Sequence, residues 1–349
     1  VQFDLNFLAA KGLTLDNAVF DTWKLATIIL PGLPSHSLET LSSFLKLKHL
    51  ESHRALDDAD ASAQLFLLLK SKIYDTKLNL LLDIDKLMRD RSWDLKPVFA
   101  EVLEDRLAKK KNDNLFSFSL AKKKQEPPAK KSKAKKSLFA ATRPESYFSA
   151  TGKLQKQINN FEYRPNQAAL AKIVMNALLD GRRVAVETPP GVGKSLAYLL
   201  PAIYFSQSKK QQVFLLQGND QEVADLEREK LPLLERLLPF GFNSQVLYQA
   251  EQYLCPARLQ DYMKNTNLDE SELTGLIKVL MWLPTTKEGN LKEISLVGDE
   301  RKILANINAG FCTGEEGCGH SKKECFFQAS RRRAQQADLL IGEHGLLAK

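Results

Sequence analysis

The chain lacks any run of about 18 uncharged apolar residues, and it has no apolar signal-peptide core. It also lacks internal repeats at solenoid periods. Its 349 residues are 44% hydrophobic and 26% charged, which are ordinary values for folded domains and exclude a peptide, a coiled coil or a wholly disordered tail. We therefore expect a soluble, cytoplasmic protein of about two domains with no membrane partner.

The basic excess is confined to one segment. Residues 106–136 hold twelve basic and two acidic residues, or +10, whereas the whole chain carries +8. Its lysine runs, interleaved with Ser, Ala and Pro, cannot bury a core, so residues 109–145 are predicted to be a disordered linker between two folded parts. The linker either adds salt-sensitive affinity for a nucleic-acid backbone or is only a solvated spacer.

An α/β pattern follows the linker. A helix is predicted from Pro165 to its closing Gly181, then a strand over 183–187, a helix over 194–205 and a strand over 213–216. Helices alternating with strands in this way predict a parallel sheet covered on both faces.

A phosphate-binding loop is predicted between the first of these strands and the second helix. It consists of Thr188, Pro189, Pro190, Gly191, Val192, Gly193, Lys194 and Ser195. The glycines permit close backbone approach, Lys194 would neutralise phosphates, and the Ser195 hydroxyl would ligate Mg²⁺. Thr188 replaces the glycine of the strict pattern, and the alternative is an ordinary glycine turn before a helix.

Four cysteines are present, and reduced intracellular thiols make disulfides unexpected. Three of them lie in a polar, glycine-rich loop that is unsuited to burying thiols, which favours metal ligation. The set is Cys255, Cys312, Cys318 and Cys325. The spacing leaves both an iron-sulfur cluster and zinc open. His320 is interpreted as an exposed loop histidine rather than a ligand.

The amino-terminal part contains a weaker constellation. Two-metal phosphodiester cleavage needs carboxylates from separate elements and a base near the attacking water. Asp4 and Asp58 are candidate ligands, and His53, with a pKa near working pH, is the candidate base. The alternative for the pair His53 and Asp58 alone is a surface histidine beside a helix-capping aspartate.

Two parts of the sequence resemble known protein families, one a helicase family and the other an exonuclease family. The segment 161–167, the phosphate loop and Tyr253-Leu-Cys-Pro-Ala-Arg258 resemble superfamily 2 helicases of the DinG and XPD kind, as do residues 331–341 with His344. This resemblance implies a RecA-like P-loop lobe that binds ATP, an adenine contact by Gln167, and a 4Fe-4S cluster on the four cysteines. Segment 216–220, residues 249–251 and Glu343 depart from the family's strand-contacting pattern, which puts DNA unwinding in doubt.

The amino-terminal residues resemble DEDDh exonucleases of the polymerase-ε-subunit kind. The resemblance rests on Phe3-Asp4, Asp21-Thr22 with Leu25-Ala26, the segment 34–41 and residues 53–58. It implies part of a ribonuclease-H-like fold that degrades single strands from 3′ ends with Mg²⁺ or Mn²⁺. The family's first acidic motif would precede Val1, and we expect the chain to be a piece of a longer protein.

The order of these parts resembles bacterial DinG proteins fused to an exonuclease. We expect the end of an exonuclease domain over 1–72, a helical extension over 73–108, the linker over 109–145, and a first helicase lobe over 146–349 with a cysteine insertion at about 250–330. The implied function is a 3′-5′ exonuclease on single-stranded nucleic acid, DNA above all, joined to an ATP-binding module in DNA repair or replication. Alternatives are a DNA-stimulated helicase with a non-catalytic nuclease-like part, and a nucleotide-gated DNA-binding scaffold.

Overall fold

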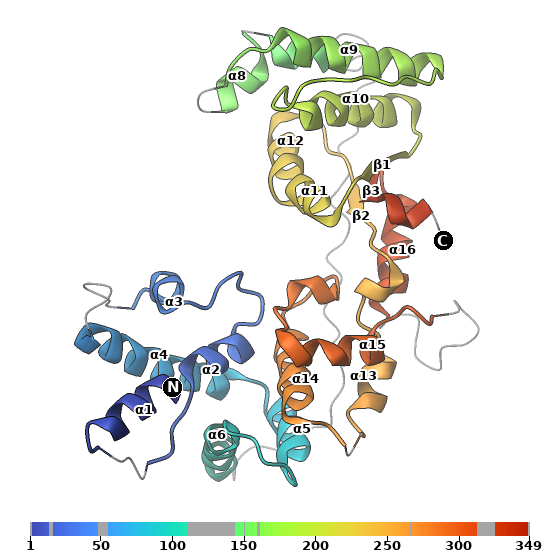
Figure 1. Ribbon diagram of the computed structural model, residues 1–349. Coiled ribbons are helices and arrows are strands. Elements are labelled where there is room, and N and C mark those ends of the chain that lie inside the picture. Colours follow the sequence, from blue (N-terminus) through green and yellow to red (C-terminus); the bar gives the residue numbers. More distant parts are fainter. Residues whose placement is uncertain are drawn as a thin grey trace. The chain divides into compact units, whose positions relative to one another are not determined.

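The computed structural model describes residues 2–13, 17–47, 55–109, 144–149, 151–158, 161–265, 267–312 and 325–347 (Figure 1). The chain divides into two compact units, residues 1–123 with 251–320, and residues 124–250 with 321–349. Most of the predicted linker, residues 110–143, lies outside the described residues. Among the described helices, none combines the length and the apolar character that a bilayer crossing requires.

The described elements of the first unit are helices, apart from two isolated β-bridges. Its amino-terminal helices are α1 (Gln2–Ala10), α2 (Thr22–Ile29), α3 (Leu38–Leu45), α4 (Ala55–Asp75), α5 (Leu78–Met88) and α6 (Lys96–Lys109). Its later elements are α13 (Pro256–Tyr262), α14 (Glu270–Trp282), η4 (Leu291–Glu293), η5 (Gly298–Ile303) and α15 (Leu304–Ile307). Residues 73–108, predicted as a helical extension, contain the end of α4 together with α5 and most of α6.

Helix α2 is the centre of this unit. The Asp21 side chain accepts hydrogen bonds from the backbone N–H groups of Trp23 and Lys24 at 2.8 and 3.1 Å, which caps the helix. Every residue from Leu25 to Ile29 is buried, so this part of the helix is covered all round rather than on one face. The Asp21-Thr22 motif therefore begins a core helix.

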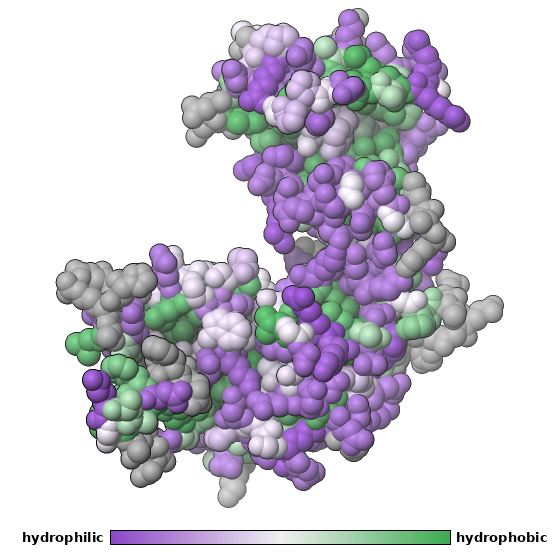
Figure 2. Space-filling model, viewed as in Figure 1, coloured by the Kyte–Doolittle hydropathy of each residue, from purple (hydrophilic) through white to green (hydrophobic). Residues whose placement is uncertain are grey.

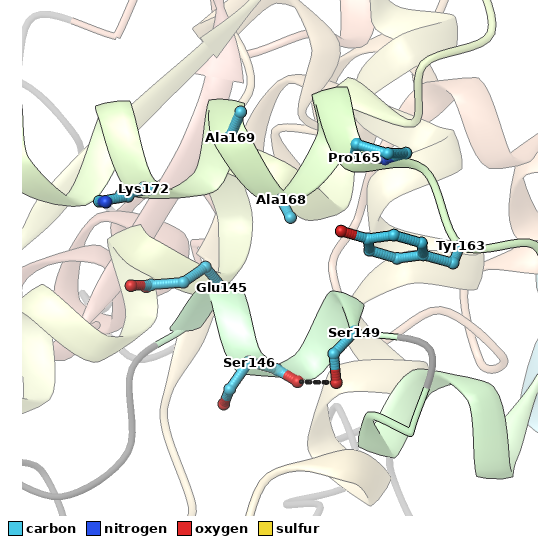
Figure 3. Close-up of a pocket in the computed structure, with 8 residues that line it drawn as sticks. All are labelled: Glu145, Ser146, Ser149, Tyr163, Pro165, Ala168, Ala169 and Lys172. Atoms are coloured by element: carbon cyan, nitrogen blue, oxygen red, sulfur yellow. Dashed lines mark hydrogen bonds between the residues drawn. The ribbon is translucent and has the colours of Figure 1, made fainter.

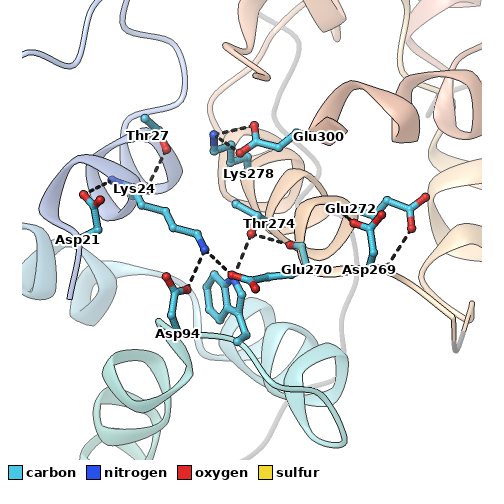
Figure 4. Close-up of polar contacts among 11 residues, drawn as sticks. Asp21, Lys24, Thr27, Asp94, Asp269, Glu270, Glu272, Thr274, Lys278 and Glu300 are labelled. Atoms are coloured by element: carbon cyan, nitrogen blue, oxygen red, sulfur yellow. Dashed lines mark hydrogen bonds and ion pairs between the residues drawn. The ribbon is translucent and has the colours of Figure 1, made fainter. Parts of the chain in front are cut away.

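Helix α14 supplies part of that cover by packing on α2 and α5. The Trp93 indole N–H donates to the Thr274 hydroxyl at 3.0 Å in a buried contact. Lys24 bridges Asp94 at 2.8 Å and Glu270 at 2.7 Å (Figure 4). Burial lowers the pKa of Lys24, but its bonds to the two carboxylates outweigh burial and raise that pKa. These contacts join the predicted cysteine insertion to the amino-terminal helices.

A buried ion pair links α14 to η5. The Lys278 side chain is fully buried and donates to both Glu300 carboxylate oxygens at 2.8 and 2.7 Å (Figure 4). The Val297 backbone N–H also donates to Glu300, at 2.9 Å. Burial lowers the pKa of Lys278, and the Glu300 carboxylate opposes that shift. Loss of either side chain would leave the other one buried without its hydrogen-bonding partner.

The second unit contains a small parallel sheet and the helices around it. Its helical elements are η1 (Pro144–Phe148), α8 (Lys153–Gln157), α9 (Pro165–Asp180), α10 (Lys194–Lys209), α11 (Asp220–Asp225), η2 (Leu226–Lys230), α12 (Leu231–Leu237), α16 (Phe326–Gln336) and η6 (His344–Leu347). Its strands are β1 (Val213–Gln217), β2 (Ser244–Val246) and β3 (Leu339–Glu343).

The sheet has the order β1-β3-β2, and both pairings are parallel. Leu339 and Ile341 of the central strand are fully buried, and they join a core that includes Leu199 and Ile203 of α10. The described residues of this unit therefore form an α/β arrangement, as the sequence predicted. The register places Gln217 beside Glu343 at the carboxyl end of the sheet.

Helix α9 and β1 confirm their predictions, but the strand expected over 183–187 is wrong. Helix α9 begins at Pro165, and Gly181 ends it with φ 63°. Residues 183–187 form no strand, and Val184 and Val186 are 52% and 43% exposed. Apolar side chains consequently reach the surface over α9 and the segment that follows it (Figure 2). Asp58, whose alternative interpretation was a helix cap, lies inside α4, which begins at Ala55.

Breaking the pair of Lys278 and Glu300 should strongly destabilise the first unit. Glu300→Gln leaves a buried lysine without its counter-charge, and we expect a loss of about 3–5 kcal/mol in the free energy of unfolding. The double variant Lys278→Met/Glu300→Leu should lose less, because neither charge remains. Urea unfolding followed by tryptophan fluorescence measures this unit alone, since Trp23, Trp93 and Trp282 all lie in it.

The pH dependence gives a second readout of the same pair. Because the folded pKa of Lys278 lies below its unfolded value of 10.5, the unfolded state binds more protons between the two values. Removing the Glu300 charge should lower the folded pKa of Lys278 further, so the destabilisation of Glu300→Gln relative to the wild type should shrink as the pH rises from the variant's folded pKa to that of the wild type. Equal losses in the single and double variants would contradict the assignment of the cost to an unpaired charge.

Candidate functional site

The phosphate loop bends through two left-handed glycines. Gly191 has φ 80° and Gly193 has φ 84°, and α10 begins directly after Gly193. No side chain caps this helix, so its first backbone N–H groups lack the partner that an Asp or Ser cap would supply. Such a helix start presents backbone donors and a positive dipole end to an anion.

The start of helix α9 is hydrogen-bonded to the phosphate loop. The Gln167 side chain is 4% exposed, and its Nε2 donates to the Gly193 carbonyl oxygen at 2.8 Å. The Arg164 guanidinium donates to the Gly191 carbonyl oxygen. A Cβ at Gly193 would stand 2.1 Å from Gln167 Nε2, whereas the space around Gly191 is open. The backbone angle therefore favours glycine at position 193, and a Cβ there would also displace the Gln167 amide.

The remaining loop residues differ in exposure. Lys194 is exposed and Ser195 half-buried, while Pro189 and Pro190 are exposed and Val192 half-buried. The Thr188 hydroxyl oxygen is buried without any hydrogen-bond partner. Buried polar atoms are nearly always paired, so an unpaired hydroxyl at the start of this loop fits a site that receives a polar ligand.

Tyr198 and Gln217 also belong to this region, although no sequence pattern indicated them. The Tyr198 hydroxyl donates to Gln217 Oε1 at 3.1 Å. Burial raises the pKa of Tyr198, so its phenol stays protonated at neutral pH. Helical spacing places Tyr198 one turn beyond Ser195 and thereby links the loop to the end of β1.

A cavity of about 380 Å³ lies where η1 meets the start of α9 (Figure 3). Its lining consists of Glu145, Ser146, Ser149, Tyr163, Pro165, Ala168, Ala169 and Lys172. The Ser149 hydroxyl donates to the Ser146 carbonyl oxygen at 3.1 Å, which fixes one wall. Tyr163 and Pro165 flank Arg164, so the cavity and the phosphate loop meet the same end of α9.

Two of the four cysteines come together in the first unit. Residues Tyr253 to Cys255 pair with Ile307 to Ala309: the Cys255 N–H donates to the Ile307 carbonyl at 2.8 Å, and the Ala309 N–H donates to that of Tyr253 at 2.9 Å. The Cys312 N–H then closes a turn onto Ala309 at 2.9 Å. Both thiols are half-buried. This pairing brings the distant Cys255 to the segment that carries Cys312.

The other two cysteines are placed differently. Cys325 lies in the second unit and directly precedes α16, and Cys318 lies outside the described residues. Among the residues that the structure describes, no group of three or more His, Cys, Asp or Glu side chains is arranged to hold a metal ion.

The predicted nuclease residues are only partly described. Asp4 belongs to α1, and Asp58 lies in the first turn of α4 with a half-buried side chain. His53 precedes α4 and lies outside the described residues. The pairing of His53 with Asp58 therefore stays a prediction.

Comparison with known proteins supports the nuclease interpretation of this end of the chain. Residues 3–66 match the exonuclease family RNase_T. That range contains Asp4, His53 and Asp58. It also spans α2, whose cap Asp21 was one of the residues carrying the resemblance.

Longer similarities extend over most of the chain. A protein named 3′-5′ exonuclease DinG from Bacillus subtilis (strain 168) is 25% identical over 99% of this chain and 38% of its own length. Proteins of the same name from Staphylococcus epidermidis and Staphylococcus aureus (strain USA300) are 26% and 24% identical over 87% and 86% of the chain. The chain spans about a third of the length of these curated relatives, 33% for each of the latter two. The resemblance to exonuclease-fused DinG proteins is therefore confirmed.

Proposed function

We propose that this chain is part of a 3′-5′ exonuclease that degrades single-stranded nucleic acid, DNA above all. The observation that supports it best is the exonuclease match over residues 3–66, together with similarity to proteins named 3′-5′ exonuclease DinG along nearly the whole chain. The capped α2, which is buried from Leu25 to Ile29, gives this region a folded core, which a solvated spacer would lack.

The proposed chemistry follows from three side chains. Divalent Mg²⁺ or Mn²⁺, when bound, would activate a water molecule and stabilise the charge that develops on the phosphodiester. Asp4 and Asp58 would hold the ions, and His53 would accept the proton of the attacking water as a general base. Asp58, in the first turn of a helix, stands where a carboxylate is favoured by the helix dipole.

Removing the base should abolish exonuclease activity. In the full-length protein, His53→Ala should slow the shortening of a 5′-labelled single-stranded oligonucleotide with Mn²⁺ by about 100-fold or more, the usual effect of losing general-base catalysis. Asp58→Asn should be similarly impaired because it weakens ion binding.

Asp60→Asn is the matched control for this experiment. Asp60 is exposed on the same helix and only accepts a hydrogen bond from Gln64 at 2.6 Å, so its variant should digest normally. Stepwise shortening that persists in His53→Ala would contradict the role of the base. A wild-type protein that leaves the oligonucleotide intact with either metal would contradict the exonuclease proposal itself.

The second unit supports a further activity, the binding of ATP with Mg²⁺. Two left-handed glycines, an uncapped helix start and the unpaired Thr188 hydroxyl form a site that fits phosphate oxygens. Lys194 would contact the phosphates, and Ser195 would contact the cation. The cavity beside Tyr163 lies at the same end of α9 and has an aromatic side chain suited to a purine base. Gln167, proposed as an adenine contact, also fixes the loop.

Removing the loop lysine should weaken nucleotide binding. We expect Lys194→Ala to raise the Kd for Mg·ATP at least about tenfold, because a hydrogen bond to a charged group contributes about 1.5–3 kcal/mol. Lys209→Ala is the matched control, since Lys209 is an exposed lysine at the opposite end of α10. Titration with a fluorescent ATP analogue measures both. Equal affinities of the two variants would contradict the assignment of the loop.

The cysteines are proposed to hold a metal centre, with a 4Fe-4S cluster favoured over zinc. Support comes from the backbone pairing that brings Cys255 to the segment of Cys312, and from the polar loop that carries Cys318. Thiolates are the ligands that both centres use, so the donor set is suitable. ATP-dependent unwinding is not proposed, because the strand-contacting segment 216–220 departs from the helicase pattern.

Metal analysis of the anaerobically purified protein tests the cysteine proposal. We expect iron and acid-labile sulfide, and Cys255→Ser or Cys318→Ser should lose most of both. His320→Ala is the control and should keep its metal. Stoichiometric zinc in a colourless protein would show the alternative centre, and a metal-free wild-type protein would contradict ligation altogether.

A further inference from the structure

Both glycines of the phosphate loop have their carbonyl oxygens held by side chains at the start of α9. The Arg164 guanidinium donates to the Gly191 oxygen, and Gln167 Nε2 donates to the Gly193 oxygen at 2.8 Å. The Gly193 oxygen also accepts the Ala197 backbone N–H at 3.4 Å, so the bond from Gln167 is the shorter of its two. Arg164 is the N-cap residue of α9 and Gln167 lies three positions further on, so one end of one helix holds two peptide units of the loop.

The direction of these carbonyls determines where the following N–H groups point. In a planar trans peptide, the C=O of one residue and the N–H of the next point to opposite sides, and no cis peptide bond occurs in the described residues. The N–H of Val192 therefore points away from Arg164, and the N–H of Lys194 points away from Gln167. Within the described part of the chain, neither N–H donates to an acceptor of the protein. Both are thus available to the oxygens of a bound phosphate.

The Gln167 side chain faces the loop and not the cavity where the base is proposed to bind. Its neighbours Pro165 and Ala168 line that cavity (Figure 3), whereas Gln167 is outside the lining and is 4% exposed. A Cβ at Gly193 would stand 2.1 Å from Gln167 Nε2, which leaves no room for a purine between them. The burial and the contact of Gln167 thus tie it to the end of the site that would receive the phosphates.

We propose that Gln167 is a positioning residue for the phosphates of a bound nucleotide: it holds the Gly193 carbonyl toward α9 and thereby keeps the Lys194 N–H directed at a phosphate oxygen. Arg164 holds the neighbouring peptide unit of the loop in the same way. This inference rests on the proposed binding of ATP. It goes beyond that proposal because it makes the affinity for phosphate, and not the choice of base, depend on Gln167.

The test compares a ligand that has a base with one that has none. Kd values and the number of binding sites are measured by calorimetry on the full chain, for ATP and for inorganic tripolyphosphate, both in excess Mg²⁺. Gln167→Met keeps most of the side-chain volume and removes the amide. We expect this variant to bind both ligands about three- to tenfold more weakly, the effect of losing one ordinary hydrogen bond, with the number of sites unchanged. Partial unfolding would instead lower the number of sites.

A second glutamine of the same unit provides the matched control. Gln207 is 8% exposed, lies near the other end of α10, and accepts a hydrogen bond from the Lys210 side chain at 3.5 Å. Gln207→Met removes a similarly buried amide and should leave both Kd values unchanged. The affinity for GTP gives a further check: Gln167→Met should weaken GTP binding by the same factor as ATP binding, since the lost contact is with the loop and not with the base.

The outcomes distinguish this inference from the proposal on which it rests. A wild-type protein that binds neither ATP nor tripolyphosphate contradicts both. Tripolyphosphate binding that is unchanged in Gln167→Met contradicts the positioning role alone, and a loss confined to ATP would show that Gln167 reads the base instead. A wild-type protein that binds ATP without binding tripolyphosphate also contradicts the positioning role, because the loop would then not hold phosphate through its own N–H groups.

Discussion

The left-handed backbone at Gly193 is the constraint on which the candidate nucleotide site depends. Its φ of 84° costs a residue with a Cβ roughly 1–2 kcal/mol, and here the Cβ would also meet Gln167 Nε2 at 2.1 Å. Because α10 begins at the next residue, this one conformation sets where Lys194 and Ser195 stand. The same helical turn carries Tyr198 to the end of β1, so loop and sheet are positioned together.

The sequence predicted correctly those elements whose ends depend on the backbone preferences of single residues, such as proline and glycine. Pro165 at the first turn and Gly181 at the end bound α9 as expected, since both residues act through their own backbone angles. The loop glycines were recognised for the same reason. The strand expected over 183–187 failed because β-branched residues favour a strand only when a neighbouring strand pairs with it, and none among the described residues does.

Contacts between distant residues were beyond sequence reasoning. Nothing in the spacing of Gln167 indicated that its amide would bind the Gly193 carbonyl, or that Tyr198 would meet Gln217 across the unit. The cysteines could be grouped by type and loop composition, but the backbone pairing that brings Cys255 to the segment of Cys312 depends on tertiary folding. Residue types thus indicated which side chains could bind a nucleotide or a metal. The contacts that position those side chains became visible only in the folded structure.

In the first unit, helices far apart in the sequence depend on one another for burial. Lys24 and Glu270 are 246 positions apart, yet α14 helps to cover α2, where Leu25 and Ile28 are fully buried. Burying such side chains contributes about 1.5–3 kcal/mol each, so the exonuclease-like helices gain part of their stability from the segment that carries Cys255 and Cys312. A metal bound only by the folded cysteines stabilises whatever folds with them. The proposed metal centre would therefore stabilise the helices of the exonuclease region as well as its own loop.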